Sequence, residues 1–132
     1  MKYICLGYMN EEIWETIPES EQNKFMDDCF AYDQELRKSG HMVGGEALED
    51  ARNAATLRWN GAKVTVTDGP FAETKEQIGG ILILEAKDLN HAIRLLSKHP
   101  SLPAGRGGGS WEIRPAADLT ALMVESQKRQ NK

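Results

Sequence analysis

Residues 64–76, which read VTVTDGPFAETKE, carry the side chains best suited to chemistry in this sequence. Val64, Val66 and Asp68 alternate, so a strand that turns both valines toward a core also turns Asp68 toward it. A carboxylate at the rim of an apolar cavity loses hydration, and this loss makes it a candidate proton donor or acceptor near neutral pH. We therefore predict Asp68 as a general acid or base, with Phe71 as an apolar wall of its cavity.

The same residues also fit a simpler interpretation, in which Asp68, Gly69 and Pro70 only form a turn. Aspartates in turns commonly accept hydrogen bonds from backbone N–H groups nearby in the chain. Spacing alone does not choose between a turn and a site, so both interpretations stay open.

Four other side chains are candidates for ligand contact or reactivity. Tyr32 could offer its phenol to a ligand, although it also fits core packing. Arg58 and Lys75 could bind an anionic substrate, although exposed basic side chains are usually solvated. Cys29 could act as a nucleophile, but a thiol on the buried face of a helix is usually packing and no adjacent base is evident.

The glycine-rich segment 105–110, GRGGGS, does not fit a phosphate-binding loop. It lacks the Gly-Lys-Ser/Thr ending and precedes a predicted strand rather than a helix. No His, Cys, Asp or Glu spacing in the chain resembles a known set of metal ligands. We expect a flexible loop at 105–110, and we expect neither a metal nor another cofactor.

The elements that would position these residues follow from hydrophobic periodicity, caps and turn signals. The strongest helix signal is a set of residues at spacings of three and four: Phe25, Cys29, Tyr32 and Leu36. In chain order we predict a strand at 2–8, a helix between Pro18 and Gly40, a strand at 42–43, a hairpin around 60–61, a central strand at 78–84, a helix capped by Asp88 that ends before Pro100, a strand at 111–114 and a C-terminal helix from Pro115.

The dipeptide Asn60-Gly61 is typical of a two-residue type I′ hairpin turn. Such a turn pairs Trp59 with Ala62, Leu57 with Val64 and Ala55 with Val66. These residues fall on one face of the hairpin, which is apolar throughout, and the polar residues between them fall on the other face. We expect burial of the apolar face to hold this register.

The predicted order is β-α-β, a β-hairpin, β-α-β and a final helix. This order matches an α+β fold of the ferredoxin-like, split β-α-β type with an extra β-hairpin and a C-terminal helix. The whole chain, 1–132, fits a single domain with an ordered core over about 1–126 and a polar tail. Two helices would cover one face of an apolar sheet, so we expect a homodimer to cover the other.

Charge and composition limit the classes of partner. The 132 residues include 16 basic and 20 acidic side chains, a formal net charge of −4 that offers no basic field to attract nucleic acid. No apolar run approaches the roughly 20 residues that span a bilayer, and the N-terminal residues do not resemble a signal peptide. We expect a cytoplasmic protein that binds neither nucleic acid nor membrane, with its cysteines reduced.

A longer motif extends the segment described first. DGPFAETKEQ at 68–77 is followed by Gly79-Gly80, an apolar strand, an Asp-led helix and EIRP at 112–115. This pattern resembles the DGPF-domain branch of the YCII-related family, and the resemblance covers most of the chain, as far as Pro115. It implies a dimeric α+β barrel in which two ferredoxin-like sheets pack together and each subunit keeps a cleft beside its sheet.

The resemblance also bears on the site. Some YCII-like members place a His and an Asp together in that cleft, but Cys29 occupies the helical position where the family histidine would fall. We therefore expect no His–Asp pair here, and Asp68 is retained as the matching carboxylate. Whether Cys29 replaces the histidine functionally stays open.

Two functions remain in competition. The first is a binder or enzyme for a small molecule, with Asp68 as acid or base in a metal-independent reaction of the isomerase or lyase type. The second is a non-enzymatic interaction module, because DGPF domains are associated with extracytoplasmic-function sigma factors and hence with transcriptional regulation. A protein whose only partner is its own second copy is a third outcome.

Overall fold

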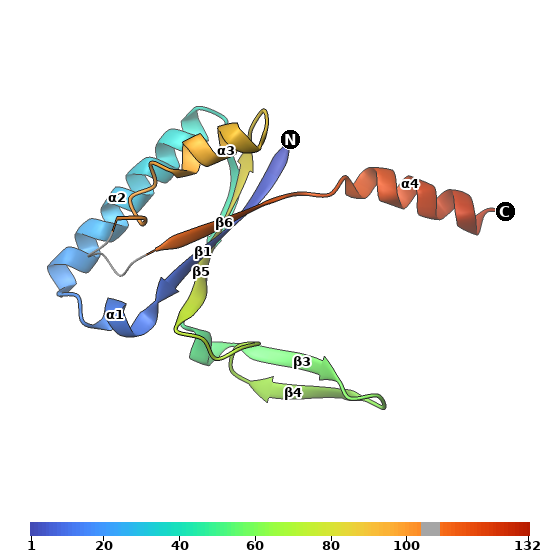
Figure 1. Ribbon diagram of the computed structural model, residues 1–132, viewed down its shortest axis with the longest axis horizontal. Helices are drawn as coiled ribbons and strands as arrows, with labels where there is room; N and C mark the ends of the chain where they lie inside the picture. Colours follow the sequence, from blue (N-terminus) through green and yellow to red (C-terminus); the bar gives the residue numbers. More distant parts are fainter. Residues whose placement is uncertain (104–108) are drawn as a thin grey trace.

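The computed structural model describes residues 1–103 and 109–132, so most of the predicted loop at 105–110 lies outside the described residues. Its elements, in chain order, are β1 (Lys2–Asn10), α1 (Glu11–Glu15), α2 (Glu19–Lys38), β2 (Met42–Ala47), the 3-10 turn η1 (Ala51–Asn53), β3 (Ala55–Trp59), β4 (Val64–Asp68), β5 (Glu76–Glu85), α3 (Leu89–Leu96), β6 (Ser110–Pro115) and α4 (Leu119–Gln130). Figure 1 shows them along the chain.

The central sheet has the strand order β2-β5-β1-β6, and every neighbouring pair in it is antiparallel. β1 and β2 are joined by α2 and separated in the sheet by β5, which is the split β-α-β arrangement. The predicted α+β, ferredoxin-like class is therefore confirmed. No helix among the residues that the structure describes is both long and apolar enough to cross a membrane.

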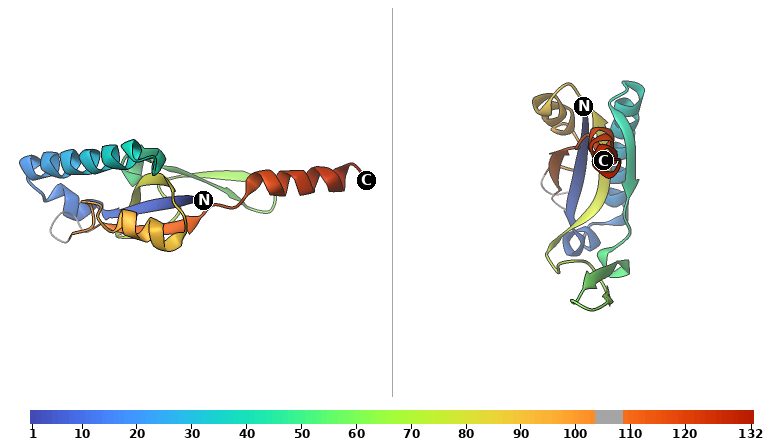
Figure 2. Two further views of the ribbon diagram at one scale, coloured as in Figure 1. Left: turned by 90° about the horizontal axis from the view of Figure 1, so that it is seen from above. Right: turned by 90° about the vertical axis from the view of Figure 1, so that its right-hand side faces the viewer.

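The helices α2 and α3 lie side by side over one face of this sheet (Figures 1 and 2). Their inner side chains and those of the sheet form the core: Cys5, Leu36, Met42, Leu82, Leu84 and Leu96. The predicted caps set the helix limits, since Asp88 accepts a hydrogen bond from the His91 N–H at 2.8 Å and Gly40 takes a φ of 80° after α2.

One expectation about the helices is wrong, and one helix was not expected. The C-terminal helix begins at Leu119 rather than at Pro115, because Pro115 is the last residue of β6 and lies opposite Tyr3 of β1. Asp118 caps this helix by accepting from the Ala121 N–H at 3.0 Å. The sequence reasoning also missed the short helix α1, whose cap is Asn10.

The hairpin register is also corrected. Trp59 lies opposite Val64, Leu57 opposite Val66 and Ala55 opposite Asp68. The turn therefore has four residues, and Asn60 closes it: its side-chain oxygen accepts from the N–H groups of Ala62 and Lys63 at 3.0 and 2.9 Å. Because the shift is an even number of residues, the apolar side chains keep a common face.

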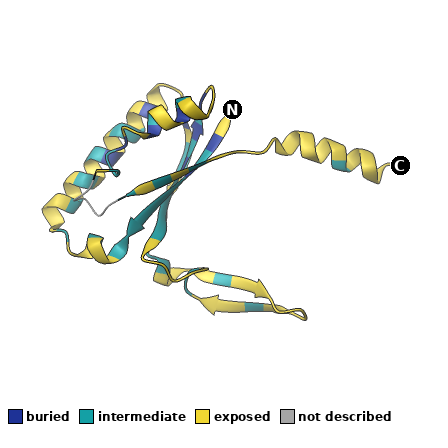
Figure 3. Ribbon diagram, viewed as in Figure 1, coloured by how far each residue is buried: buried dark blue, intermediate teal, exposed yellow. Residues whose placement is uncertain are grey.

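That apolar face is not buried in the monomer. The hairpin β3–β4 extends away from the central sheet, and α4 extends away from it in another direction (Figures 1 and 3). Trp59 is 67% exposed and Val66 is 65% exposed, so burial within one chain does not hold the register as we expected. Figure 3 shows that α4 and the hairpin are mostly exposed along their length.

Candidate functional site

A cleft of about 560 Å³ lies between α2 and the central sheet. Most of its walls are apolar, and the large apolar side chains that line it include Trp14, Phe25, Met26, Phe30, Ile81 and Trp111. Trp14 and Phe25 meet edge to face with ring centroids 5.0 Å apart, which joins α1 to α2 at one end of the cleft. A pocket of this size and lining suits a small, mostly apolar molecule.

Glycines of the sheet make room for this cleft. A Cβ atom on Gly7 would lie 2.8 Å from the Trp111 ring, so only a glycine in β1 lets that indole lie against the strand. Gly79 of β5 approaches Met9 in the same way, because a Cβ atom on Gly79 would lie 2.8 Å from the Met9 sulfur. Of the glycine pair that forms part of the sequence motif, Gly79 thus contributes space, whereas a Cβ atom on Gly80 would meet only the Glu46 carbonyl at an ordinary 3.6 Å.

One wall of the cleft carries a buried histidine. His99 follows α3, and its backbone N–H bonds the Leu96 carbonyl at 3.0 Å, so the end of the helix fixes its position. The side chain is buried, and its Nε2 lies 3.2 Å from Oδ1 of Asp33. Asp33 is one turn after Cys29 on α2, which places both on the side of the helix that lines the cleft.

The other ring nitrogen of His99 also has a partner. Nδ1 lies 2.7 Å from the Ser101 hydroxyl oxygen, and the Trp111 indole N–H donates to the same oxygen at 2.8 Å. The four side chains join α2, the segment after α3 and β6 through one chain of hydrogen bonds. All four line the cleft.

Tyr32 packs beside this cluster. Its ring meets that of His99 edge to face with centroids 5.7 Å apart, and its hydroxyl donates a hydrogen bond to the Leu95 carbonyl. Burial, and then the negative charge of Glu35, raises the pKa of Tyr32, so the phenol stays neutral. The structure thus gives Tyr32 a packing partner and a backbone acceptor, and its contact with a ligand stays a prediction.

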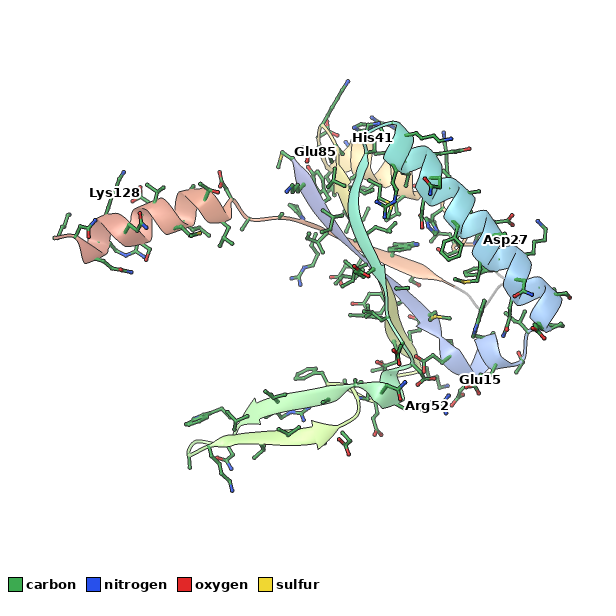
Figure 4. The ribbon with its side chains drawn as sticks, turned by 180° about the vertical axis from the view of Figure 1, so that it is seen from behind. Glu15, Asp27, His41, Arg52, Glu85 and Lys128 are labelled. Atoms are coloured by element: carbon green, nitrogen blue, oxygen red, sulfur yellow. The ribbon has the colours of Figure 1, made fainter. Side chains whose placement is uncertain are left out.

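Asp68 lies outside this cleft. It ends β4 opposite Ala55 on the projecting hairpin and is exposed, so the expected covered position at the rim of the core is wrong. Asp68 and Lys75 together line a second, shallower cavity of about 410 Å³ near α1 and η1. Arg52 beside this cavity pairs with Glu15 at 3.6 Å, and both are labelled in Figure 4. An acid–base role for Asp68 stays a prediction.

Arg58 and Phe71 are brought together by the hairpin. The guanidinium donates to the Phe71 carbonyl at 2.8 Å and lies 5.2 Å from the centre of the Phe71 ring. Phe71 is 78% exposed, so in the monomer it forms no wall of a closed cavity. The sequence-predicted residues therefore fall into two pairs at the hairpin, and Tyr32 lies apart from both.

Both cysteines are buried, as predicted, and neither forms a disulfide. Burial raises the pKa of the Cys5 thiol to about 11. Within 1–103 and 109–132, no group of three or more His, Cys, Asp and Glu side chains has the arrangement of a metal site. That the protein binds no metal or other cofactor remains an expectation.

The YCII-related domain matches residues 1–120. The chain belongs to the YCII-related family. It is also similar to a protein of Rhizobium meliloti (strain 1021) named "Uncharacterized protein R00369", with 32% identity over 121 residues that cover 89% of this chain and 93% of the relative. The resemblance read from the motif at 68–77 is therefore confirmed at the level of the family.

In this YCII-related protein we expected no His–Asp pair, because Cys29 stands at the position of the family histidine. The structure forms such a pair from other residues, His99 and Asp33. Two signals could have found it. Asp33 is a carboxylate at i+4 from a buried cysteine, and His99 comes directly after the stripe of an amphipathic helix.

Proposed function

We propose that this YCII-related protein binds a small, largely apolar molecule in the cleft between α2 and the sheet. The further proposal is that it transforms this molecule by acid–base chemistry that depends on His99 and Asp33. A single observation carries it: a histidine that is only 4% exposed, paired at 3.2 Å with a carboxylate, lies in the wall of a mostly apolar cleft of about 560 Å³.

The apolar walls would supply most of the binding energy. Transfer of apolar surface from water contributes about 25 cal/mol per Å², so a small ring that fits between Phe30 and Ile81 would bind without a charged contact. The polar cluster would then set its orientation and supply the proton transfer. No metal is needed for such a step, which keeps the isomerase or lyase class within the proposal.

The pair of His99 and Asp33 has better support than Asp68 as the acid–base group. His99 is enclosed by the rings of Tyr32 and Trp111, so water competes little with a bound molecule. Asp68 lines a shallow cavity on an exposed hairpin. If Asp68 does take part, we expect a second subunit to cover it.

We also infer a homodimer. The hairpin presents Leu57, Trp59, Val64 and Val66 to solvent, and α4 presents Leu119, Leu122 and Met123. Clusters of exposed apolar side chains of this kind mark interaction surfaces. A second copy can cover it symmetrically, since each subunit offers the same projecting elements. Contact with a sigma factor stays a prediction.

A ligand screen by thermal shift tests the proposed site. Apolar ring compounds are screened against the wild type, Asp33→Asn and Asp27→Asn. Asp27 lies on the same helix but is exposed, so Asp27→Asn is a matched control (Figure 4). We expect a compound that stabilises the wild type and the control more than Asp33→Asn. A compound that stabilises all three proteins equally would place binding elsewhere.

A further inference from the structure

We propose that Ser101 is a nucleophile and that the cleft hydrolyses small apolar carboxylic esters through an acyl-serine intermediate. His99 would be the general base and Asp33 a positioning residue. This inference rests on the proposed function in one respect, namely that the cleft binds a ligand. It adds the reacting atom and the substrate class.

The hydrogen-bond order is that of a nucleophile, a base and a carboxylate. The Ser101 hydroxyl lies 2.7 Å from His99 Nδ1, and His99 Nε2 lies 3.2 Å from the Asp33 carboxylate. In serine proteases the two ring nitrogens have the opposite assignment. Because either nitrogen of a neutral imidazole can accept while the other donates, the exchanged arrangement can still remove the hydroxyl proton.

The partners fix the direction of each hydrogen bond. In the proposed arrangement the Asp33 carboxylate accepts from a proton on His99 Nε2, and Nδ1 presents its lone pair. An indole N–H only donates, so Trp111 donates to the Ser101 oxygen at 2.8 Å, and the serine hydrogen is directed to His99. The Ser101 backbone N–H also donates to Nδ1 at 3.2 Å, so Nδ1 acts as an acceptor in both contacts, and the contact with the hydroxyl is the shorter one.

Access selects Ser101 as the reacting group. The His99 side chain is nearly enclosed, with each nitrogen engaged, so a ligand does not reach its lone pair directly. Ser101 is only half-buried and lines the cleft. The base therefore acts on a bound molecule through the serine oxygen, which is the arrangement of an activated nucleophile.

The proposed reaction has two balanced stages. Ser101 Oγ bonds to the ester carbonyl carbon while its proton passes to His99 Nδ1. The ester C–O bond then breaks, and the leaving oxygen takes that proton and departs as the alcohol. Water next attacks the acyl-serine, giving one proton to Nδ1, and the acid leaves as Oγ recovers the proton. Asp33 stabilises the transient imidazolium at Nε2.

The test uses the full chain and an alkyl fluorophosphonate, a probe that labels activated serines. We expect one adduct by intact mass, located on Ser101 by peptide mapping. Ser97→Ala is the matched control, because Ser97 is exposed and bonds the Ile93 carbonyl of α3. We expect it to label as the wild type does, whereas His99→Asn lowers the labelling rate about 100-fold or more.

Hydrolysis of p-nitrophenyl butyrate gives a second readout. Asp33→Asn should lower kcat by at least about tenfold while KM stays within about twofold, because a positioning residue acts on the transition state. Equal losses in Asp33→Asn and Asp27→Asn would contradict that role. The mapping on wild-type protein requires no variant, so it stands even if His99→Asn or Asp33→Asn fails to fold.

Two negative results are distinguishable. If the wild type binds apolar compounds in the cleft but the probe forms no adduct on Ser101, the role of Ser101 as a nucleophile is refuted and the proposed function stands. If neither an adduct nor a stabilising compound is found, both fail. Labelling of Ser101 at the same rate in the wild type and His99→Asn would refute the role of His99 as the general base.

Discussion

His99 Nε2 lies 3.2 Å from Asp33 Oδ1, although 66 residues separate them in the chain. The contact joins the end of α3 to the middle of α2, the two helices that cover the sheet. It also turns the imidazole so that its other nitrogen meets Ser101. The pair therefore acts both as a structural link and as the centre of the candidate site.

Loss of the carboxylate should destabilise the fold. Asp33→Ala leaves the buried His99 N–H without its acceptor, and an unsatisfied buried donor costs about 1–3 kcal/mol. We expect a lower urea midpoint with an unchanged slope. Asp27→Ala on the same helix is the control, and a similar loss in that variant would attribute the effect to α2 in general.

Gly7→Ala should displace the Trp111 side chain and so disturb the candidate site. The new Cβ would lie 2.8 Å from the Trp111 ring, so the indole must move and its bond to Ser101 weakens. Overpacking of this kind typically costs about 1–3 kcal/mol. Gly80→Ala is the matched control, because its Cβ would meet only the Glu46 carbonyl at an ordinary 3.6 Å. Urea unfolding of both variants measures the difference, and equal losses would contradict the close approach.

The reactivity of Cys5 should depend on folding. Burial raises the pKa of its thiol from 9.0 to about 11, so at pH 9 the folded chain holds roughly fiftyfold less thiolate at this residue than the unfolded chain. We expect slow iodoacetamide alkylation of Cys5 at pH 9 and rapid alkylation in guanidinium, followed by mass spectrometry. Rapid reaction in the native protein would contradict the burial.

The raised pKa of Cys5 also makes the free energy of unfolding depend on pH. Above pH 9 the unfolded chain loses the Cys5 proton, while the folded chain keeps it until about pH 11. The unfolded state then binds fewer protons, so stability falls as pH rises through this window. Cys5→Ala should remove this part of the fall, as measured by urea unfolding at pH 8 and pH 10.

The hairpin should matter for assembly more than for the monomer. Trp59→Ser removes an exposed apolar side chain, so we expect an unchanged monomer fold by circular dichroism and a weaker dimer by sedimentation. Thr67→Ser changes the opposite face of the same hairpin and is the control. A wild type that stays monomeric at all concentrations would refute the inferred dimer.

The sequence was sufficient for the elements that depend on near neighbours. Three such signals depend only on residues close in the chain: the apolar stripe of α2 at Cys29 and Leu36, the helix cap at Asp88 and the apolar run of β5. The structure contains each of them. The common face of Leu57 and Val66 also follows from strand alternation alone.

The site itself depended on distant contacts. Asp33 belongs to no motif in the sequence, and only the packing of α3 beside α2 brings it to His99, whereas Ser101 lies two residues from His99 in the chain. The hairpin register failed for a different reason, since the Asn60 side chain closes a four-residue turn in place of the two-residue turn that Asn-Gly favours. Burial was assumed for Asp68, but its hairpin projects from the sheet.

The position of β1 in the sheet has a consequence for the nascent chain during translation. β1 is synthesised before both of its sheet partners, β5 and β6, and the strand that completes its pairing is Ser110–Pro115. At about 5–20 residues per second, translation takes on the order of 10 s to reach β6. Throughout that time the apolar strand lacks a neighbour on one edge. Chaperone capture of β1 during translation should therefore end only when β6 has left the ribosome.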